Sequence, residues 1–382
     1  MLVMKKEIEK KEILPILVGF LYFAITEISI FLGIFGIPRE LIYGLFFLFF
    51  FLYALKYIKH LDTFDWLIIF LLLAVVVTGM IGYSKYVVSL TNKLAPLLIF
   101  FPAYIFFRLY TFTRLEDMFE KAGLFAGIIL LFYYFVIIRN TGATYSMSYA
   151  YWVAFPIVVY LSAFLETKKP IFIIGFSVLF TTLFVSGSRG ALFLTILCVF
   201  YLLLLVTLEK GMTPRKIFGL SCLGIAAFVV VNLNNKILLF LSQFSSSSRN
   251  IRIILSGGMF ESPARERIYE TCRQLIRQNR WGYGPLASRQ LLLGHNYPHS
   301  LWYELQLDYG QFLGILIFAL IILTVFYNLY KYRDKKERAL VAYICIVGIG
   351  SLMVSSSYLY EICVPAVMAM AINWNKYYKQ RV

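Results

Sequence analysis

The sequence is poor in the residues from which metal centres and disulfide scaffolds are built. It has only three histidines and five cysteines, and the cysteines show neither a metal-ligand spacing nor a disulfide spacing. Acidic residues are rare inside the apolar segments, where Glu27 is the one clear case. This shortage disfavours a transporter, which needs ionisable groups near helix midpoints. No internal repeat and no cleavable signal peptide are evident, so the first apolar segment is expected to remain as an anchor.

Apolar residues are present in excess. They make up 60% of the chain, aromatic residues make up 18%, and the mean hydropathy is +0.77. Because about 20 apolar residues cross a bilayer core, these runs predict an all-α integral membrane protein with about twelve transmembrane helices. The predicted segments are 13–36, 41–55, 64–83, 94–107, 122–138, 149–166, 170–186, 191–208, 217–235, 311–330, 339–355 and 359–375.

The net charge of +16 is distributed in a way that indicates topology and not a nucleic-acid partner. With both termini placed in the cytoplasm, the inner segments carry 22 lysines and arginines and the short outer segments carry five, as the positive-inside rule requires. Nine more cations, eight of them arginine, lie in one long outer segment, 236–300. We therefore expect transmembrane helices 1–9 in 1–235, a large extracytoplasmic loop in 236–300, and helices 10–12 with a cytoplasmic tail in 301–382.

Arginine in that long loop suits bidentate recognition of phosphate, although a solvated or headgroup-facing surface would also be cationic. The stretch "SPARERIYETCRQLIRQN" predicts a helix with Ser262 as N-cap. Arg265 falls on the same face as the apolar Ile268, where it either meets a buried anion or snorkels at the helix end. Arg289 follows the turn "GYGP", in which glycine would let the backbone approach a ligand.

Arg189 lies in the turn "SGSRG" between two apolar segments. A charge at membrane depth is costly and indicates a functional site. Its small neighbours leave backbone N–H groups accessible, which suits a phosphate. The charge distribution places this turn on the same membrane face as the arginine-rich loop.

His295 and His299 are four residues apart in "GHNYPHS". That spacing can hold a metal on a helix, but Pro298 lies between them and no third ligand follows a recognisable pattern, so no metal is expected. His299 is then either a general base, because a neutral imidazole accepts a proton near pH 7, or an anchor of a helix end at the interface.

Three motifs together resemble the O-antigen polymerase and O-antigen ligase superfamily. They are "SGSRGALF", then an arginine four residues before an aromatic that leads to "GYGP", then "YPHSLWYELQLDYGQFLG". The chain departs from the family at Ser300, where asparagine is usual, and at Asp308, where glutamate is usual. The matching positions are Arg189, Arg265, Tyr269, His299, Glu304, Asp308, Gly310 and Gly314.

The resemblance implies a membrane glycosyltransferase of the GT-C class in the bacterial cytoplasmic (inner) membrane, with its active site on the outer face. Its donor and acceptor would be oligosaccharides on undecaprenyl pyrophosphate, and the product a surface polysaccharide such as O-antigen or capsule. It further implies a chain-length regulator and a flippase as partners, besides membrane lipid, and no cofactor or metal. Arg189, Arg265 and Arg289 would bind the pyrophosphate. His299 would be the base, with His295 or Glu304 as alternatives.

Three other functions remain open at this point. The first is a ligase that transfers the glycan to a lipid A core sugar, which shares these motifs. The second is a polytopic transporter or flippase, which gives no reason for a large arginine-rich outer loop. The third is a non-catalytic assembly partner, in which changing the histidines would be harmless.

Overall fold

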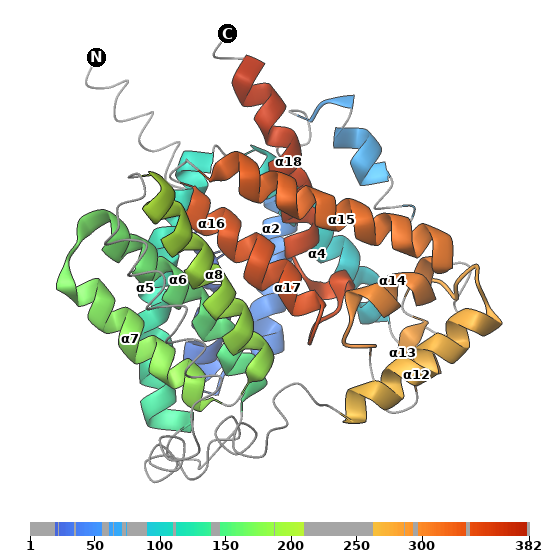
Figure 1. The fold of residues 1–382 in the computed structure, drawn as a ribbon, viewed down its shortest axis with the longest axis horizontal. Helices are drawn as coiled ribbons and strands as arrows, with labels where there is room; N and C mark the ends of the chain where they lie inside the picture. Colours follow the sequence, from blue (N-terminus) through green and yellow to red (C-terminus); the bar gives the residue numbers. More distant parts are fainter. Residues whose placement is uncertain are drawn as a thin grey trace. The chain divides into compact units, whose positions relative to one another are not determined.

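The structure, a computed structural model, describes residues 20–21, 23–33, 36–55, 61–63, 65–70, 74, 90–109, 112–138, 146–186, 188–209, 263–285, 287–292, 297–333 and 337–379. Every regular element within these ranges is a helix, and they contain no strand. The prediction of an all-α chain is therefore confirmed for the part that the structure describes, which is drawn in Figure 1.

The helices vary widely in length. In chain order they are α2 (Arg39–Leu55), α4 (Leu90–Leu109), α5 (Phe112–Tyr133) with the π-helix η3 (Tyr134–Ile138), α6 (Met147–Thr167), α7 (Pro170–Val185), α8 (Arg189–Glu209), α12 (Pro263–Gln278), α13 (Ser288–Leu291), α14 (Leu301–Tyr309), α15 (Gln311–Tyr332), α16 (Arg338–Ala342), the π-helix η4 (Tyr343–Gly348), α17 (Ile349–Leu352), the 3-10 helix η5 (Tyr358–Tyr360) and α18 (Cys363–Lys379).

Several of these helices are apolar enough to cross a membrane. Shorter apolar helices run over Phe23–Gly33, Leu41–Leu55, Ile99–Arg108, Pro170–Val185, Arg338–Leu352 and Cys363–Ile372. The helices with both the length and the composition of a full span are Leu115–Ile138, Met147–Thr167, Arg189–Leu208 and Gln311–Tyr332. The chain is an integral membrane protein, and each of these helices coincides with a predicted apolar segment. The count of twelve stays a prediction, since 217–235 lies outside the described residues.

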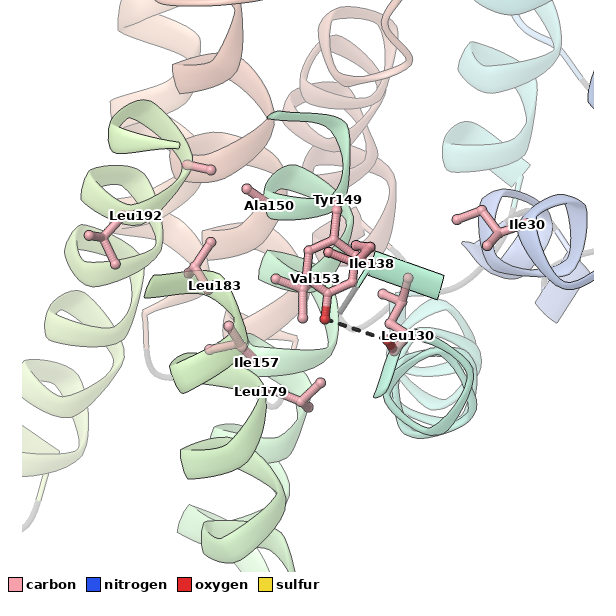
Figure 2. Packing of buried hydrophobic residues seen from close by; sticks show 11 residues of the cluster. Ile30, Leu130, Ile138, Tyr149, Ala150, Val153, Ile157, Leu179, Leu183 and Leu192 are labelled. Carbon is pink, nitrogen blue, oxygen red and sulfur yellow. Dashed lines mark hydrogen bonds between the residues drawn. The ribbon is translucent and has the colours of Figure 1, made fainter. Parts of the chain in front are cut away.

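The chain forms two compact units, and each is described here by itself. The first unit comprises Met1–Ile42, Phe112–Glu261 and Tyr332–Val347, and its core lies around α6. A buried hydroxyl needs a partner, and that of Tyr149 donates to Thr182 Oγ1 over 2.9 Å and lies 3.4 Å from the carbonyl oxygen of Leu130. Figure 2 shows the apolar cluster that surrounds it, whose buried members are Ile30, Leu130, Ile138, Tyr149, Ala150, Val153, Ile157, Leu179, Leu183, Ala191 and Leu192.

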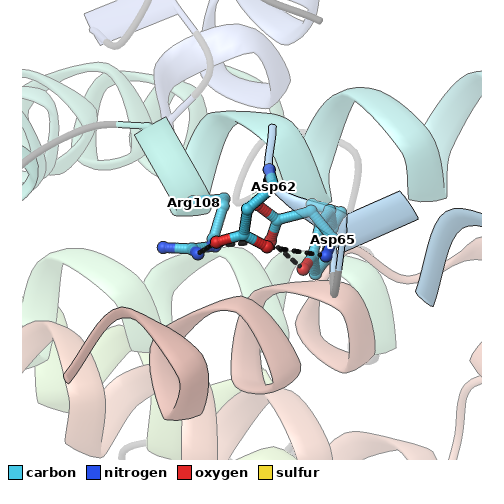
Figure 3. Close-up of polar contacts among 4 residues, drawn as sticks. Asp62, Asp65 and Arg108 are labelled. Carbon is cyan, nitrogen blue, oxygen red and sulfur yellow. Dashed lines mark hydrogen bonds and ion pairs between the residues drawn. The ribbon is translucent and has the colours of Figure 1, made fainter. Parts of the chain in front are cut away.

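The second unit comprises Tyr43–Thr111, Ser262–Lys331 and Gly348–Val382, and it contains a buried ion pair. Arg108 on α4 donates to Asp65 Oδ1 over 2.6 Å and to Asp62 Oδ2 over 3.0 Å, as Figure 3 shows. The Tyr104 hydroxyl also donates to Asp65 Oδ1, over 2.7 Å. Because a buried charge is costly without its partner, this network holds α4 to the helical turn that begins at Asp65.

α15 is bound to α18 on one side and exposed on the other. The Asn328 side-chain amide donates to the Val367 carbonyl over 3.0 Å, and the Lys331 ammonium donates to the Ala371 carbonyl over 3.2 Å. A stripe of exposed large apolar side chains, suited to contact with lipid, covers the opposite side. The stripe contains Phe312, Leu313, Leu316, Leu320, Leu323, Phe326, Tyr327 and Tyr330. The helix α14, which carries the family signature, ends where this span begins.

Candidate active site

His299 lies in the histidine loop, residues 297–300, which leads directly into α14. Its φ of 57° is a left-handed conformation that non-glycine residues rarely adopt. Its half-buried ring packs on that of Tyr297, with the centroids 4.4 Å apart, and the Tyr269 hydroxyl donates to its carbonyl oxygen over 3.5 Å. Such a backbone persists only where its surroundings hold it, and it is typical of functional sites.

A second segment, the serine–tyrosine turn at 353–361, holds both the histidine loop and Glu304. The Tyr297 hydroxyl donates to the Ser355 carbonyl over 2.6 Å. Glu304, whose exposure is 1%, accepts hydrogen bonds from the Ser357 hydroxyl and, over 3.4 Å, from the Tyr358 N–H. One turn therefore binds Glu304 directly and binds the loop of His299 through Tyr297, although the sequence alone related the two residues only through a motif.

The serine–tyrosine turn was not predicted from the sequence as part of the site. It overlaps the end of the apolar segment predicted at 339–355 and the start of the one predicted at 359–375, where the sequence reads "SSSYLYE", because α17 already ends at Leu352 and α18 begins only at Cys363. The sequence feature that could have indicated this turn is its run of hydroxyl side chains, which follows an apolar run and precedes another. A buried carboxylate such as Glu304 requires hydrogen-bond donors, and hydroxyl groups can supply them. Nothing in the sequence paired that run with Glu304, more than 50 residues away.

Asp308, one turn after Glu304 on α14, is a buried acid. It is 3% exposed and its Oδ2 accepts from the Tyr358 hydroxyl over 2.8 Å, whereas its Oδ1 has no partner among the described residues. Burial raises the pKa of Asp308 well above its usual range, and the negative charge of Glu304 raises it further, against the lowering effect of the Tyr358 hydrogen bond. Burial and the nearby charge of Glu304 therefore both favour the neutral form of this acid.

Replacing Asp308 by asparagine should make the stability of the protein less dependent on pH. An acid whose pKa is raised in the folded state stabilises the fold most at a pH below its unfolded pKa, which is about 3.9 for aspartate. This stabilising contribution is lost as the pH rises toward the pKa of the folded state. The melting temperature of Asp308→Asn relative to wild type should therefore increase as the pH rises above about 4. Thermal unfolding of the detergent-solubilised proteins measures it, and a difference that is constant with pH would contradict a neutral Asp308. Asp308→Ala, which removes the hydrogen bond as well, should be less stable than wild type at the lower pH.

The turn "GYGP" caps the C-terminal end of α14. The last carbonyls of a helix lack partners within it. Here the Tyr283 N–H donates to the Leu307 carbonyl over 2.6 Å, and the Gly284 N–H donates to the Asp308 carbonyl over 3.0 Å. Gly282 and Gly310, with φ of 88° and 82°, bring the two backbones into contact. The glycines of two separate motifs thus allow one close backbone contact, and this contact joins the end of α12 to the end of α14.

Gly310→Ala should destabilise the protein. Gly310 has φ 82° and ψ 167°, a region open essentially to glycine alone, and an added Cβ would lie 2.5 Å from the Arg280 carbonyl oxygen. The expected loss is about 1–3 kcal/mol or more, seen as a lower melting temperature in detergent. Gly44→Ala on α2 is the matched control, because a Cβ there meets nothing within 4 Å, and it should be neutral or stabilising by up to about 1 kcal/mol. Equal melting temperatures for the two variants would contradict the packing described.

α12 confirms the predicted helix, and the face that carries Ile268 is buried. Its buried side chains pack with α13 and α14 in a cluster of Ile268, Cys272, Ile276, Leu292 and Leu307. Burial raises the pKa of the Cys272 thiol to about 12, so this cysteine is an inert core residue. The predicted N-cap, Ser262, lies outside the described residues.

Arg265 is half-buried in the first turn of α12, where the helix dipole favours an anion. Burial raises the pKa of Tyr269, one turn later, and the charge of Arg265 opposes this rise. The Tyr269 hydroxyl is the group that contacts the His299 carbonyl, so Arg265 is linked to the histidine loop through one side chain. No carboxylate pairs with Arg265 among the described residues, whereas the exposed Arg273 lies 2.5 Å from Glu266.

Arg189 belongs to the first unit and is the first residue of α8, where it is half-buried. The turn before it is fixed: the Ser146 N–H donates to the Ser186 carbonyl over 3.1 Å, and the Leu192 N–H donates to the Ser188 carbonyl over 3.1 Å. The predicted turn between two apolar helices is present, and it places Arg189 at a helix N-terminus, which suits an anion.

Two further predicted site residues are Arg289 and His295. Arg289 lies on the short helix α13, which packs against α14. His295 lies outside the described residues. The described residues contain no group of three or more histidine, cysteine, aspartate or glutamate side chains that could hold a metal ion.

A family model matches part of the chain. No curated protein matches the chain significantly. The family model described as O-antigen ligase matches residues 174–319. This range contains the turn before α8, α12, the histidine loop and α14, and hence every predicted site residue. The match over residues 174–319 confirms the resemblance of the chain to the O-antigen polymerase and O-antigen ligase superfamily.

Proposed function

We propose that the protein is a polymerase of surface-polysaccharide repeat units. It transfers the growing glycan from undecaprenyl pyrophosphate to the non-reducing end of a lipid-linked repeat unit, at the outer face of the cytoplasmic membrane. Both termini then lie in the cytoplasm, as the distribution of lysine and arginine in the loops indicates. A chain-length regulator and a flippase would be its partners.

One observation carries the proposal: a single turn holds the histidine loop and Glu304 together. Tyr297 bonds this turn at Ser355, and Glu304 accepts hydrogen bonds from Ser357 and Tyr358. The acceptor sugar is a neutral alcohol and becomes a good nucleophile only as its proton leaves, so the reaction needs a fixed base. An imidazole in a restrained loop that shares one turn with an ordered acidic side chain suits that role.

In the proposed reaction one bond forms, one bond breaks and one proton is transferred. The acceptor hydroxyl oxygen forms a bond to the anomeric carbon of the donor sugar, and the bond from that carbon to the pyrophosphate oxygen breaks. The hydroxyl proton passes to the His299 imidazole, and undecaprenyl pyrophosphate leaves with the electron pair. Glu304 orients the histidine loop through the shared turn, and it is the alternative base.

Negative charge grows on the pyrophosphate as the bond breaks, and fixed cations stabilise that charge in the transition state. Arg265 is suited to this role because it is half-buried, stands at a helix N-terminus and pairs with no described carboxylate. We propose Arg189 and Arg289 as further contacts to the pyrophosphate or to the phosphates of the acceptor.

The second candidate is an O-antigen ligase, which the description of the matching family favours. Purified protein supplied with a lipid-linked repeat unit alone separates the two activities. A ladder of products supports the polymerase. Transfer that begins only when a lipid A core acceptor is added would identify a ligase, and the absence of glycan transfer in both assays would contradict both candidates.

A further inference from the structure

Trp281 is an exposed aromatic side chain with no role in the proposed chemistry. It lies directly after α12, before the turn "GYGP", and its exposed fraction is 87%. Tryptophan is rarely left in water, and it is enriched where one part of a protein meets the boundary between lipid and water. Its position in the fold indicates what covers it.

The backbone at Trp281 is bound to the first residue of a membrane span. The Gln311 N–H, at the start of α15, donates to the Arg280 carbonyl over 2.8 Å. The next residue, Phe312, has an exposed fraction of 72% and begins the apolar stripe that α15 presents along its length. Trp281 therefore lies at the level where the lipid-facing surface of α15 ends.

The exposed charged residues near Trp281 are cationic, although the neutral Asn279 side chain also accepts a hydrogen bond from the Trp281 N–H over 3.1 Å. Arg277 and Arg280 are exposed, and no carboxylate pairs with either of them among the described residues. Of the exposed acids of α12, Glu266 lies in the first turn, at the opposite end of the helix, where it pairs with Arg273, and Glu270 lies near the middle. Unpaired arginines beside an interfacial aromatic are the complement of an anionic lipid headgroup.

We infer that Arg277, Arg280, Trp281 and Phe312 form an anchor that binds the membrane surface at the end of α15. The Trp281 and Phe312 rings enter the boundary of the acyl chains, and the two guanidinium groups bind the phosphates of anionic phospholipid. Because α12 also carries Arg265, the anchor fixes the height of that arginine above the membrane. The inference is independent of the proposed function, since it concerns lipid and not the glycan substrates.

A fluorescent probe at position 281 tests the anchor in the full-length protein. The described native cysteines are buried, and Cys222, outside the described residues, is replaced by alanine. Trp281→Cys is labelled with an environment-sensitive dye, and the protein is placed in nanodiscs of phosphatidylcholine and phosphatidylglycerol. We expect emission at short wavelength and strong quenching by a nitroxide on the lipid headgroup or upper acyl chain. Thr271→Cys, exposed on α12 away from the anchor, is the matched control and should be quenched by aqueous iodide instead.

A second measurement tests the charges separately. At equal mole fraction, headgroup-labelled phosphatidylglycerol should quench the dye at 281 more strongly than labelled phosphatidylcholine. Replacing Arg277 and Arg280 by glutamine should reduce this preference by about fivefold for each cation lost. Iodide quenching of the dye at 281 without lipid quenching would overturn the inference. So would protection from both quenchers that depends on protein concentration, which would indicate a second copy of the chain.

Discussion

His299→Asn should reduce glycan transfer by about 100- to 10,000-fold, the range over which a general base accelerates a reaction, with little effect on stability. Asparagine is among the few residues that tolerate the left-handed conformation found at this position. It therefore keeps the backbone of the histidine loop and removes only the basic nitrogen. Product formation from a purified lipid-linked repeat unit measures the loss, and the melting temperature in detergent verifies the fold.

A second variant at the same position separates a missing base from a displaced loop. His299→Gly accepts the φ of 57° without strain and leaves space for a small molecule. Added imidazole should restore part of its activity, with a pH dependence that follows the ionisation of the added base. His299→Asn with normal product would rule out the base. A loss of activity in His299→Gly without rescue, together with a lowered melting temperature, would indicate that His299 only shapes the loop.

The positions of many helices can be predicted from the sequence, because helix formation and apolar periodicity depend on residues that are close together in the chain. The limits of α6 (Met147–Thr167) and α7 (Pro170–Val185) lie within two residues of the predicted 149–166 and 170–186. Pro170 starts α7 as the first residue of a helix, and Lys168 with φ 59° ends α6, so short-range chemistry sets both boundaries. The apolar face of α12 follows from its spacing in the same way.

Contacts between distant segments could not be predicted, because a single sequence does not show which polar residues meet. The charge distribution treats Arg108 only as one of the cations that set topology, yet it is buried and pairs with the buried Asp65 and the exposed side chain of Asp62. The approach of Gly282 to Gly310, and of Ser357 to Glu304, depends on how helices pack and not on local spacing. The motifs indicated which residues matter, and the structure supplies the physical reason for several of them.

Arg265→Gln should reduce transfer by about 100- to 1000-fold, as expected for the loss of one fixed group that stabilises charge in a transition state. The matched control is Arg267→Gln, two residues along α12. Arg267 is exposed, whereas Arg265 is half-buried beside Tyr269. Both variants lose one positive charge from the same helix, so a general electrostatic effect would reduce both activities equally. Equal losses would contradict a specific contact between Arg265 and the substrate.

Arg189→Lys extends this test to the first unit. Lysine keeps the charge but lacks the planar pair of donors that a guanidinium presents to a phosphate, so we expect a clear loss of activity at normal protein level. Full activity would mean that Arg189 acts only as a charge or in the structure of its turn. If Arg189 and Arg265 hold the same pyrophosphate, the loss in the double variant should be smaller than the product of the two single losses, because residues that act on one group are not additive. Losses that multiply would indicate that the two arginines bind separate groups, for example one on the donor and one on the acceptor.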